Sequence, residues 1–118
     1  MFRTLFFLAA VICAVGAIDL SPENFDTLVG ADKPAFVKFF APWCGHCKRM
    51  APAWKEIEDA QDKVVIGDVD CTIHRELCSK FDVKGFPTLK TFAAGSQEAA
   101  DYSGGRNMAD LKAQVDTM

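Results

Sequence analysis

Apolar residues follow two different spacings along this chain, and the tighter spacing predicts strands. Residues 35–40 (AFVKFF) are almost continuously apolar, as expected of a central strand that is covered on both faces. Residues 64–69 (VVIGDV) have the same character and predict a second buried strand. Residues 89–92 and 100–102 flank a Gly-Ser turn, which predicts a β-hairpin.

Apolar residues at helical spacing predict four helices around these strands. Residues 21–23 (SPE) supply an N-cap serine, a first-turn proline and an acidic residue for a short first helix. A longer helix is predicted over residues 44–61 with a bend near Pro52, a third over residues 73–81, and a last one that is capped by Asn107. The residues expected to face the core from these helices are Phe25, Leu28, Val29, Cys47, Met50, Trp54, Ile57, Met108, Leu111 and Val115.

Helices that alternate with strands and are followed by a hairpin predict an α/β domain, with a mixed central β-sheet flanked by helices on both faces. Residues 18–118 contain no repeat or low-complexity linker and therefore predict one small domain. A core of this size is adequate but small, so a disulfide would help to stabilise it.

The N-terminus has the pattern of a secretory signal peptide. Arg3 precedes an apolar run over residues 5–15, and small residues follow it up to Ala17. A membrane anchor is the alternative, but the run is shorter than the ~20 residues that a spanning helix needs. We therefore expect a signal peptide over residues 1–17 and a mature domain that begins at Ile18, in the endoplasmic reticulum lumen or secreted.

Charge and cysteine content narrow the function classes. The net charge is −3, and it becomes −4 without Arg3, because 12 basic residues then face 16 acidic ones. The two signs are mixed along the chain, which excludes nucleic acid as an expected partner, and no membrane association is expected after signal removal. Cys13 leaves with the signal, so four cysteines remain in an oxidising compartment where disulfides persist.

Residues 41–48 (APWCGHCK) carry the most specific chemistry. A thiol at the start of a helix meets unpaired backbone N–H groups and the positive end of the helix dipole, which favour the thiolate. Cys44 is therefore the predicted nucleophile. Cys47 lies one helical turn further on, where its sulfur can resolve a mixed disulfide and close a redox-active Cys44–Cys47 bond.

The two residues between these cysteines, Gly45 and His46, influence whether the protein oxidises or reduces the thiols of its substrates. A partly protonated His46 imidazole beside the thiolate would stabilise the reduced form and make the disulfide a stronger oxidant. Reduction potentials of proteins with a redox-active CxxC pair span roughly −270 to −180 mV, a difference of roughly 4 kcal/mol in free energy. We expect this chain near the oxidising end of that range. The alternative is a static disulfide or half of a metal site, as in a secreted binding or chaperone module.

Three segments together resemble the protein disulfide isomerase family: residues 39–48 (FFAPWCGHCK), 85–88 (GFPT) and 102–106 (YSGGR). The resemblance covers the chain from Ile18 to the C-terminus. It implies one catalytic thioredoxin-fold domain that forms and rearranges disulfides in secretory-pathway proteins, with no metal or other cofactor. Its expected partners are protein substrates and either glutathione or an upstream oxidase, and the domain is expected to be monomeric.

The resemblance also implies a substrate-binding loop. X–Pro bonds are cis in only about 5% of cases, so the residues alone predict a trans Phe86–Pro87 bond. The family resemblance implies a cis bond packed against the active-site cysteines, in a loop to which an extended substrate can add as a strand. Trp43 is a candidate for an apolar substrate contact, and the alternative is that it covers the edge of the core.

Arg106 resembles a family arginine that swings toward the active site and lowers the pKa of the resolving cysteine. The alternative is a solvated arginine at the start of a helix.

Lys38 departs from the commoner family pattern, which has a buried carboxylate six positions before the first active cysteine. A lysine inside an apolar strand must be paired or must reach water. We expect the Lys38 side chain to reach the surface or to pair with Glu56 or Asp68, and to relay protons poorly. Replacing Lys38 with glutamate should then speed the attack of Cys47 on mixed disulfides.

Cys71 and Cys78 are expected to form a structural disulfide, because some family members carry a cysteine pair in an equivalent segment. One alternative is two buried free thiols. A further alternative is a zinc site that the two cysteines share with Cys44, Cys47, His46 or His74.

Overall fold

Five strands form one mixed sheet in the order β1-β3-β2-β4-β5. The computed structural model describes residues 17–118, so the predicted signal peptide lies outside the described residues except for Ala17. The three strands β1, β3 and β2 are parallel, whereas β4 and β5 run antiparallel to their neighbours. The strands are β1 (Ile18–Asp19), β2 (Ala35–Phe40), β3 (Val65–Asp70), β4 (Thr88–Phe92) and β5 (Ala99–Tyr102).

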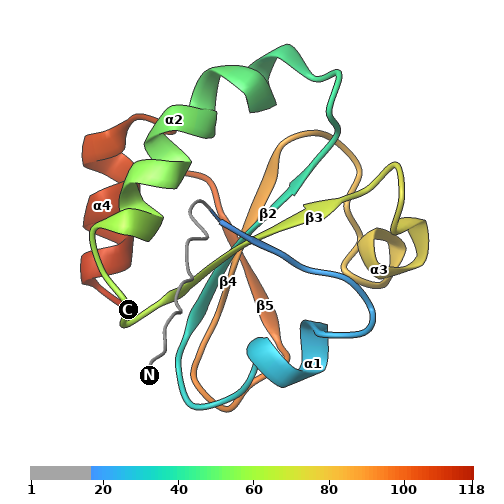
Figure 1. Cartoon of the computed structure of the whole chain (residues 1–118), viewed down its shortest axis with the longest axis horizontal. Helices are drawn as coiled ribbons and strands as arrows, with labels where there is room; N and C mark the ends of the chain where they lie inside the picture. Colours follow the sequence, from blue (N-terminus) through green and yellow to red (C-terminus); the bar gives the residue numbers. More distant parts are fainter. Residues whose placement is uncertain (1–16) are drawn as a thin grey trace, which may run out of the picture.

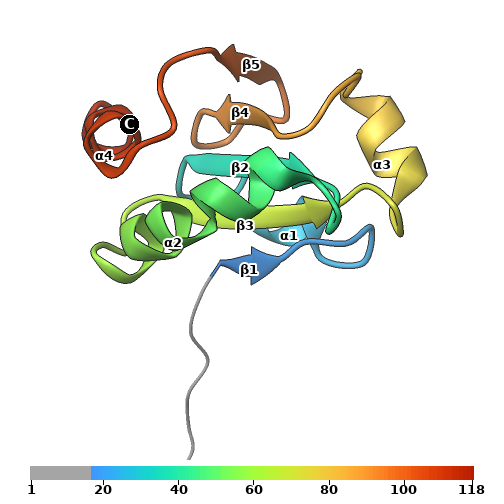
Figure 2. The same cartoon turned by 90° about the horizontal axis from the view of Figure 1, so that it is seen from above.

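Within residues 17–118, four helices cover the two faces of this sheet. They are α1 (Phe25–Leu28), α2 (Gly45–Asp59), α3 (Arg75–Lys80) and α4 (Met108–Asp116). Figure 1 shows α2 and α4 together on one side of the strands and α1 and α3 on the other, and Figure 2 shows the strands in their order from β5 to β1. The predicted α/β class, with a mixed sheet flanked on both faces, is confirmed. No helix within residues 17–118 combines the length and the apolarity needed to cross a bilayer.

Each face of the sheet has its own apolar core, because β2 is central and buried on both sides. On the face of α2 and α4, Phe36 packs edge-to-face against Trp54, with ring centroids 4.8 Å apart. On the face of α1 and α3, Phe81 packs against Phe25 and Phe92 with centroids 5.2 and 5.3 Å apart. A third, smaller apolar cluster of Ala41, Cys44 and Cys47, against which Phe40 and Phe86 pack, joins the start of α2 to the loop before β4 and carries the predicted active site.

The structure differs from the sequence predictions at one strand and at the starts of two helices. The strand β1 was not predicted, because only Leu20 after it is deeply buried while both of its own residues are exposed. Ser21 is not a side-chain N-cap; instead the Asn24 side chain accepts the Ser21 N–H at 2.7 Å. The helix predicted from Ile73 begins at Arg75, because the Asp70 carbonyl accepts the N–H groups of residues 73 and 74 in a turn.

Candidate active site

Cys44 is the N-cap of α2, at the carboxyl end of the central strand β2. Its sulfur accepts the backbone N–H of Cys47 at 3.3 Å, which is the capping role that an oxygen plays in most helices. The Cys47 thiol lowers the pKa of Cys44 most, and the backbone N–H groups of Cys47 and His46 and the charge of Arg106 lower it further. The thiolate that the sequence predicts is therefore favoured by groups from two separate parts of the chain.

Cys47 lies inside the first turn of α2 and is more deeply buried than Cys44, with 4% of its surface exposed against 7%. Burial and the hydrogen bond with Cys44 raise the pKa of Cys47 to about 11. Both cysteines are free thiols in this structure. A thiol whose pKa is lowered, one helical turn from a thiol whose pKa is raised, suits a nucleophile and a resolving cysteine, because the first gives up its proton more readily.

The side chain of His46 lies against Arg49. The guanidinium Nη2 is 2.7 Å from the imidazole Nδ1, one helical turn away. The contribution of His46 to the lowered pKa of Cys44 comes from its backbone N–H. The three-residue spacing of His46 and Arg49 on the helix permits this contact, which also needs particular rotamers of both exposed side chains.

Gly45 is the first residue of α2, and a side chain there would be tolerated. A Cβ at this position would lie 3.5 Å from Arg49 Nη1, an ordinary van der Waals distance. The fold of residues 17–118 therefore does not require glycine here, and the small residue leaves the neighbouring thiol open to a substrate.

The loop before β4 faces the cysteines, as the resemblance implies. The Phe86–Pro87 bond is cis, and the Phe86 carbonyl oxygen accepts a hydrogen bond from the Cys44 thiol at 3.5 Å. Phe86 also contacts Trp43 edge-to-face, with ring centroids 5.8 Å apart. Trp43 is nevertheless 68% exposed, so it does not serve mainly to cover the core, and its ring is available to a ligand beside Cys44.

Arg106 follows a segment with two closely packed glycines. A Cβ at Gly105 would meet the Asp110 carboxylate, and one at Gly104 would meet the Tyr102 hydroxyl, so that these side chains would have to move. Tyr102 donates to the Gly105 carbonyl at 2.5 Å, which fixes this turn. The exposed Arg106 and the buried Pro87 both line a surface cavity of about 300 Å³. From this position, the positive charge of Arg106 lowers the pKa of Cys44.

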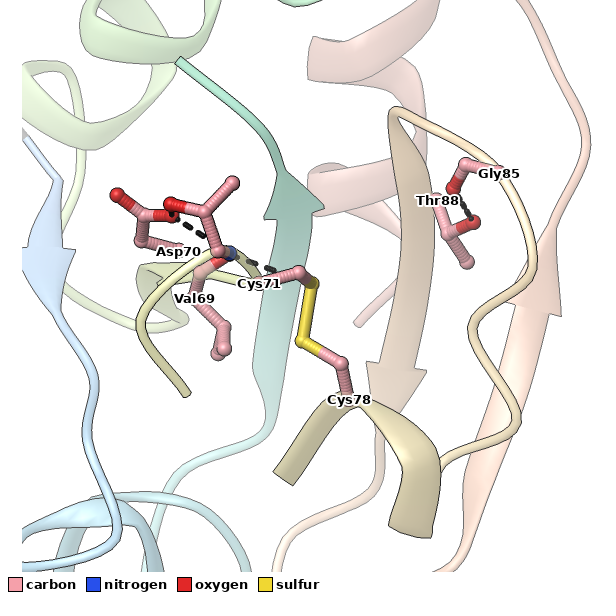
Figure 3. Close-up of a disulfide and its surroundings, with 7 residues drawn as sticks. Val69, Asp70, Cys71, Cys78, Gly85 and Thr88 are labelled. Atoms are coloured by element: carbon pink, nitrogen blue, oxygen red, sulfur yellow. Dashed lines mark hydrogen bonds between the residues drawn. A yellow bond between two sulfur atoms is a disulfide. The ribbon is translucent and has the colours of Figure 1, made fainter. Parts of the chain in front are cut away.

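Cys71 and Cys78 form a disulfide in the structure, with an S–S distance of 2.12 Å and Cα atoms 5.7 Å apart (Figure 3). The bond joins the end of β3 to α3, and both cysteines are buried in the core on that face. Thr72, next to Cys71, donates its backbone N–H and its hydroxyl to the Asp70 carboxylate at 2.9 and 2.6 Å. Within residues 17–118, no group of three or more His, Cys, Asp or Glu side chains is placed to hold a metal ion.

Lys38 is buried and lies 3.6 Å from Asp68 on the neighbouring strand, one of the two partners that the sequence suggests. Its ammonium does not reach the surface, since only 7% of the side chain is exposed.

Comparison with known proteins agrees with this geometry. A model of the thioredoxin family matches residues 16–117. The chain is 51% identical over 112 residues to the protein disulfide-isomerase tigA of Aspergillus niger, covering 91% of this chain and 31% of the relative. It is 49% identical over 110 residues to the protein disulfide-isomerase-like protein EhSep2 of Emiliania huxleyi, covering 88% of this chain and 49% of the relative.

Among solved structures, the first thioredoxin domain of mouse protein disulfide-isomerase A4 matches with a TM-score of 0.71 and 37% identity. That match covers 84% of this chain and 72% of the mouse domain. The chain thus spans 31% of the length of one of these curated relatives and 49% of the length of the other. It belongs to the thioredoxin family, as a thioredoxin domain of the protein disulfide-isomerase type.

Proposed function

We propose that this chain is a thiol–disulfide oxidoreductase that forms and rearranges disulfides in proteins folding in the secretory pathway. The observation that carries the proposal is the position of the Cys44 sulfur. It caps α2, accepts the Cys47 N–H at 3.3 Å, and lies against the Phe86 carbonyl of the cis-proline loop. A thiol of lowered pKa at a helix start, beside the apolar side chains of Trp43 and Phe86, can attack a disulfide in an extended peptide.

The proposed reaction has two directions. In isomerisation, the Cys44 thiolate attacks a substrate disulfide and one substrate sulfur leaves as a thiolate. A second substrate thiolate then attacks the mixed disulfide, so that a new substrate disulfide forms and the Cys44 thiolate is released. If Cys47 attacks the Cys44 sulfur instead, the substrate leaves as a dithiol and the enzyme is left with the Cys44–Cys47 disulfide. In oxidation, a substrate thiolate attacks the Cys44–Cys47 disulfide, and the pair of electrons ends on the enzyme as two thiols. The lowered pKa of Cys44 stabilises the reduced enzyme and therefore favours oxidation of substrates.

The remaining roles follow the positions of the side chains. Trp43 and Phe86 provide apolar contact to a substrate beside Cys44, and the backbone around Pro87 offers hydrogen bonds to an added strand. Arg106 supports the thiolates by its charge. The same proposal includes cleavage of a signal peptide after Ala17, a monomeric domain, and reoxidation by glutathione or an upstream oxidase.

Trapping of covalent intermediates tests the proposal. The Cys47→Ser variant should accumulate mixed disulfides between Cys44 and a scrambled test protein, because the sulfur that releases the substrate is gone. These adducts should be seen by non-reducing electrophoresis and should disappear in the Cys44→Ser/Cys47→Ser control. A folded Cys47→Ser variant that forms no adduct would show instead a binding or chaperone module in which the cysteines have a structural role.

A further inference from the structure

A surface cavity adjoins the cis-proline loop where the β4–β5 hairpin opens. It has a volume of about 300 Å³ and is lined by residues 87–89 at the start of β4 and by residues 101–104 and Arg106 around the end of β5. The β4–β5 ladder ends at the pair Leu89 and Tyr102. Pro87 and Thr88 therefore extend beyond the last paired residue of β5, while the chain after β5 turns toward α4 and leaves the cavity between them.

This cavity lies within reach of a peptide that reacts with Cys44. The Cys44 thiol donates to the Phe86 carbonyl at 3.5 Å, and the cavity begins at the next residue, Pro87. An extended chain rises by about 3.3 Å per residue, so residues 87–89 cover roughly 3–10 Å of backbone beyond Phe86. A substrate strand that runs along this loop would thus place in the cavity a side chain from within three residues of its reacting cysteine.

The charged groups around the cavity leave one positive charge without a partner. Asp101 accepts a hydrogen bond from the buried ammonium of Lys90 at 2.6 Å, so these two charges compensate each other. Arg106 forms no ion pair with any group in residues 17–118. Asp110 is the other carboxylate close to this turn, but it does not line the cavity and accepts the Asn107 side-chain amide at 2.9 Å.

The hydroxyl groups of the lining are only partly used. Thr88 donates to the Gly85 carbonyl at 2.7 Å, as Figure 3 shows, and Tyr102 donates to the Gly105 carbonyl at 2.5 Å. The Ser103 hydroxyl makes no hydrogen bond within the described part of the chain. A guanidinium with a free hydroxyl beside it suits a carboxylate, because the planar guanidinium can donate two parallel hydrogen bonds to its two oxygens.

We propose that this cavity is a subsite for an acidic side chain of the substrate, a role that rests on the proposed function. Arg106 holds the carboxylate of an aspartate or glutamate that lies within three residues of the cysteine attacked by Cys44. The subsite thereby selects among protein substrates by the sequence around their cysteines, in addition to the apolar contact with Trp43 and Phe86.

The overall charge of the chain cannot supply this preference. The net charge is −3, so the field of the whole molecule repels an acidic peptide. Arg49 is the rival cation, because its Nη2 atom lies 2.7 Å from His46 Nδ1 and its Nη1 atom lies close to Gly45, next to Cys44. Arg49 does not line the cavity, and it is therefore the matched control for Arg106.

The test uses short peptides that carry one cysteine as a mixed disulfide with 2-thiopyridine. Each peptide has Asp, Asn or Lys at one of the three positions on either side of that cysteine. The Cys44 thiolate of the reduced chain attacks the peptide sulfur, the Cys44–peptide bond forms, and the thiopyridine leaves as a thiolate with the bonding electron pair and is protonated by solvent. Its absorbance in stopped-flow mixing gives a second-order rate constant for each peptide.

The wild-type chain should favour acidic peptides at particular positions. At one or two positions the Asp peptide should react about two- to fivefold faster than the Asn peptide, as expected of a partly exposed ion pair, and the Lys peptide should react more slowly than both. Because neighbouring side chains of an extended strand point to opposite sides, the preference should not appear at all six positions. It should fall toward one in about 1 M salt, which screens exposed charges.

Two variants of Arg106 and the Arg49 control assign the preference to its residue. The ratio of the Asp to the Asn rate constant should fall to about one in Arg106→Gln, should stay above one in Arg106→Lys, and should keep its wild-type value in Arg49→Gln. A change in the reactivity of Cys44 cancels in this ratio, because every peptide meets the same thiol. The ratio therefore separates a subsite from the effect of Arg106 on the pKa of Cys44.

The same measurement on the 2-thiopyridyl disulfide of glutathione and on its dimethyl ester covers a second source of carboxylates. If Arg106→Gln changed only the ratio of glutathione to its ester, Arg106 would serve glutathione and the inference would be wrong. An Asp-to-Asn ratio near one at every position, an equal ratio at all six positions, or a ratio lost in Arg49→Gln and kept in Arg106→Gln would also overturn it. A wild-type chain that reacts with every peptide no faster than a free thiol would instead contradict the proposed function.

Discussion

The acidity of Cys44 comes from several weak donors rather than from one neighbouring charge. The Cys47 thiol contributes most, and the first backbone N–H groups of α2 and the guanidinium of Arg106 add to it. N–H groups at a helix start have no partner within the helix, so they are available to any anion at the N-cap. The nucleophile is therefore built from the second thiol of the pair and from the backbone N–H groups at the helix start, and the CxxC spacing encodes both.

His46 allows the backbone and the imidazole to be separated. His46→Ala removes the ring and keeps the N–H, whereas His46→Pro removes both at a position in the first turn where proline is tolerated. Because the N–H is the group that lowers the pKa of Cys44 from this residue, we expect the pKa to rise more in His46→Pro than in His46→Ala.

The pH dependence of Cys44 alkylation measures both variants under the same conditions. If His46→Ala raised the pKa as much as His46→Pro did, the imidazole and not the backbone would be responsible.

At this scale the sequence predicted the identities of the reacting residues better than their interactions. Cys44 and Cys47 follow from their spacing, and the structure places Phe86 and Trp43 beside them. The contact of His46 with Arg49 depends on the rotamers of two exposed side chains. The hydrogen bond from the Cys44 thiol to the Phe86 carbonyl depends on a loop that the fold brings close. Local sequence therefore fixes neither this hydrogen bond nor the His46–Arg49 contact.

At the scale of elements, the Cys71–Cys78 disulfide holds the short helix α3 to the end of β3. A helix of six residues is not stable by itself, so tertiary contacts and this bond must hold it. The cross-link closes a loop of eight residues, which corresponds to about 2.5 kcal/mol of stabilisation in the chain-entropy description.

Removing this bond should lower stability without altering the nucleophile. We expect the Cys71→Ala/Cys78→Ala variant to lose about 2.5 kcal/mol of unfolding free energy in urea titrations, and its rate of Cys44 alkylation to match the wild type. The variant should also be insensitive to reductant, whereas the reduced wild type should fall to a similar stability. A loss below about 0.5 kcal/mol would show that α3 is held by packing alone.

Elements with strong periodicity were predicted well, and short elements held by turns were not. The strands β2 and β3 are continuous apolar runs, and their boundaries differ from prediction by at most one residue. The strand β1 has two exposed residues and exists only because β3 offers it hydrogen bonds. The start of α3 is delayed by the turn around Asp70, a side-chain interaction that competes with helix formation.

At the scale of the whole molecule, the site is assembled from segments that are far apart in sequence. Helix α2 brings the cysteines, the loop before β4 brings Phe86 and Pro87, and the turn after β5 brings Arg106. The central sheet fixes all of these segments, because β2 and β4 are direct neighbours in it. The Lys38–Asp68 pair is likewise a product of strand register rather than of any local motif.

The central claim is that the assembled domain lowers the pKa of Cys44 below that of an ordinary cysteine. The most direct measurement is the rate of Cys44 alkylation in the reduced protein between pH 4 and 10, with mass spectrometry to identify the labelled residue. The account predicts a midpoint below the value of about 8.5 of an ordinary cysteine, and little labelling of Cys47 in the same range. A midpoint at or above about 8.5 for Cys44 in the folded chain would contradict it.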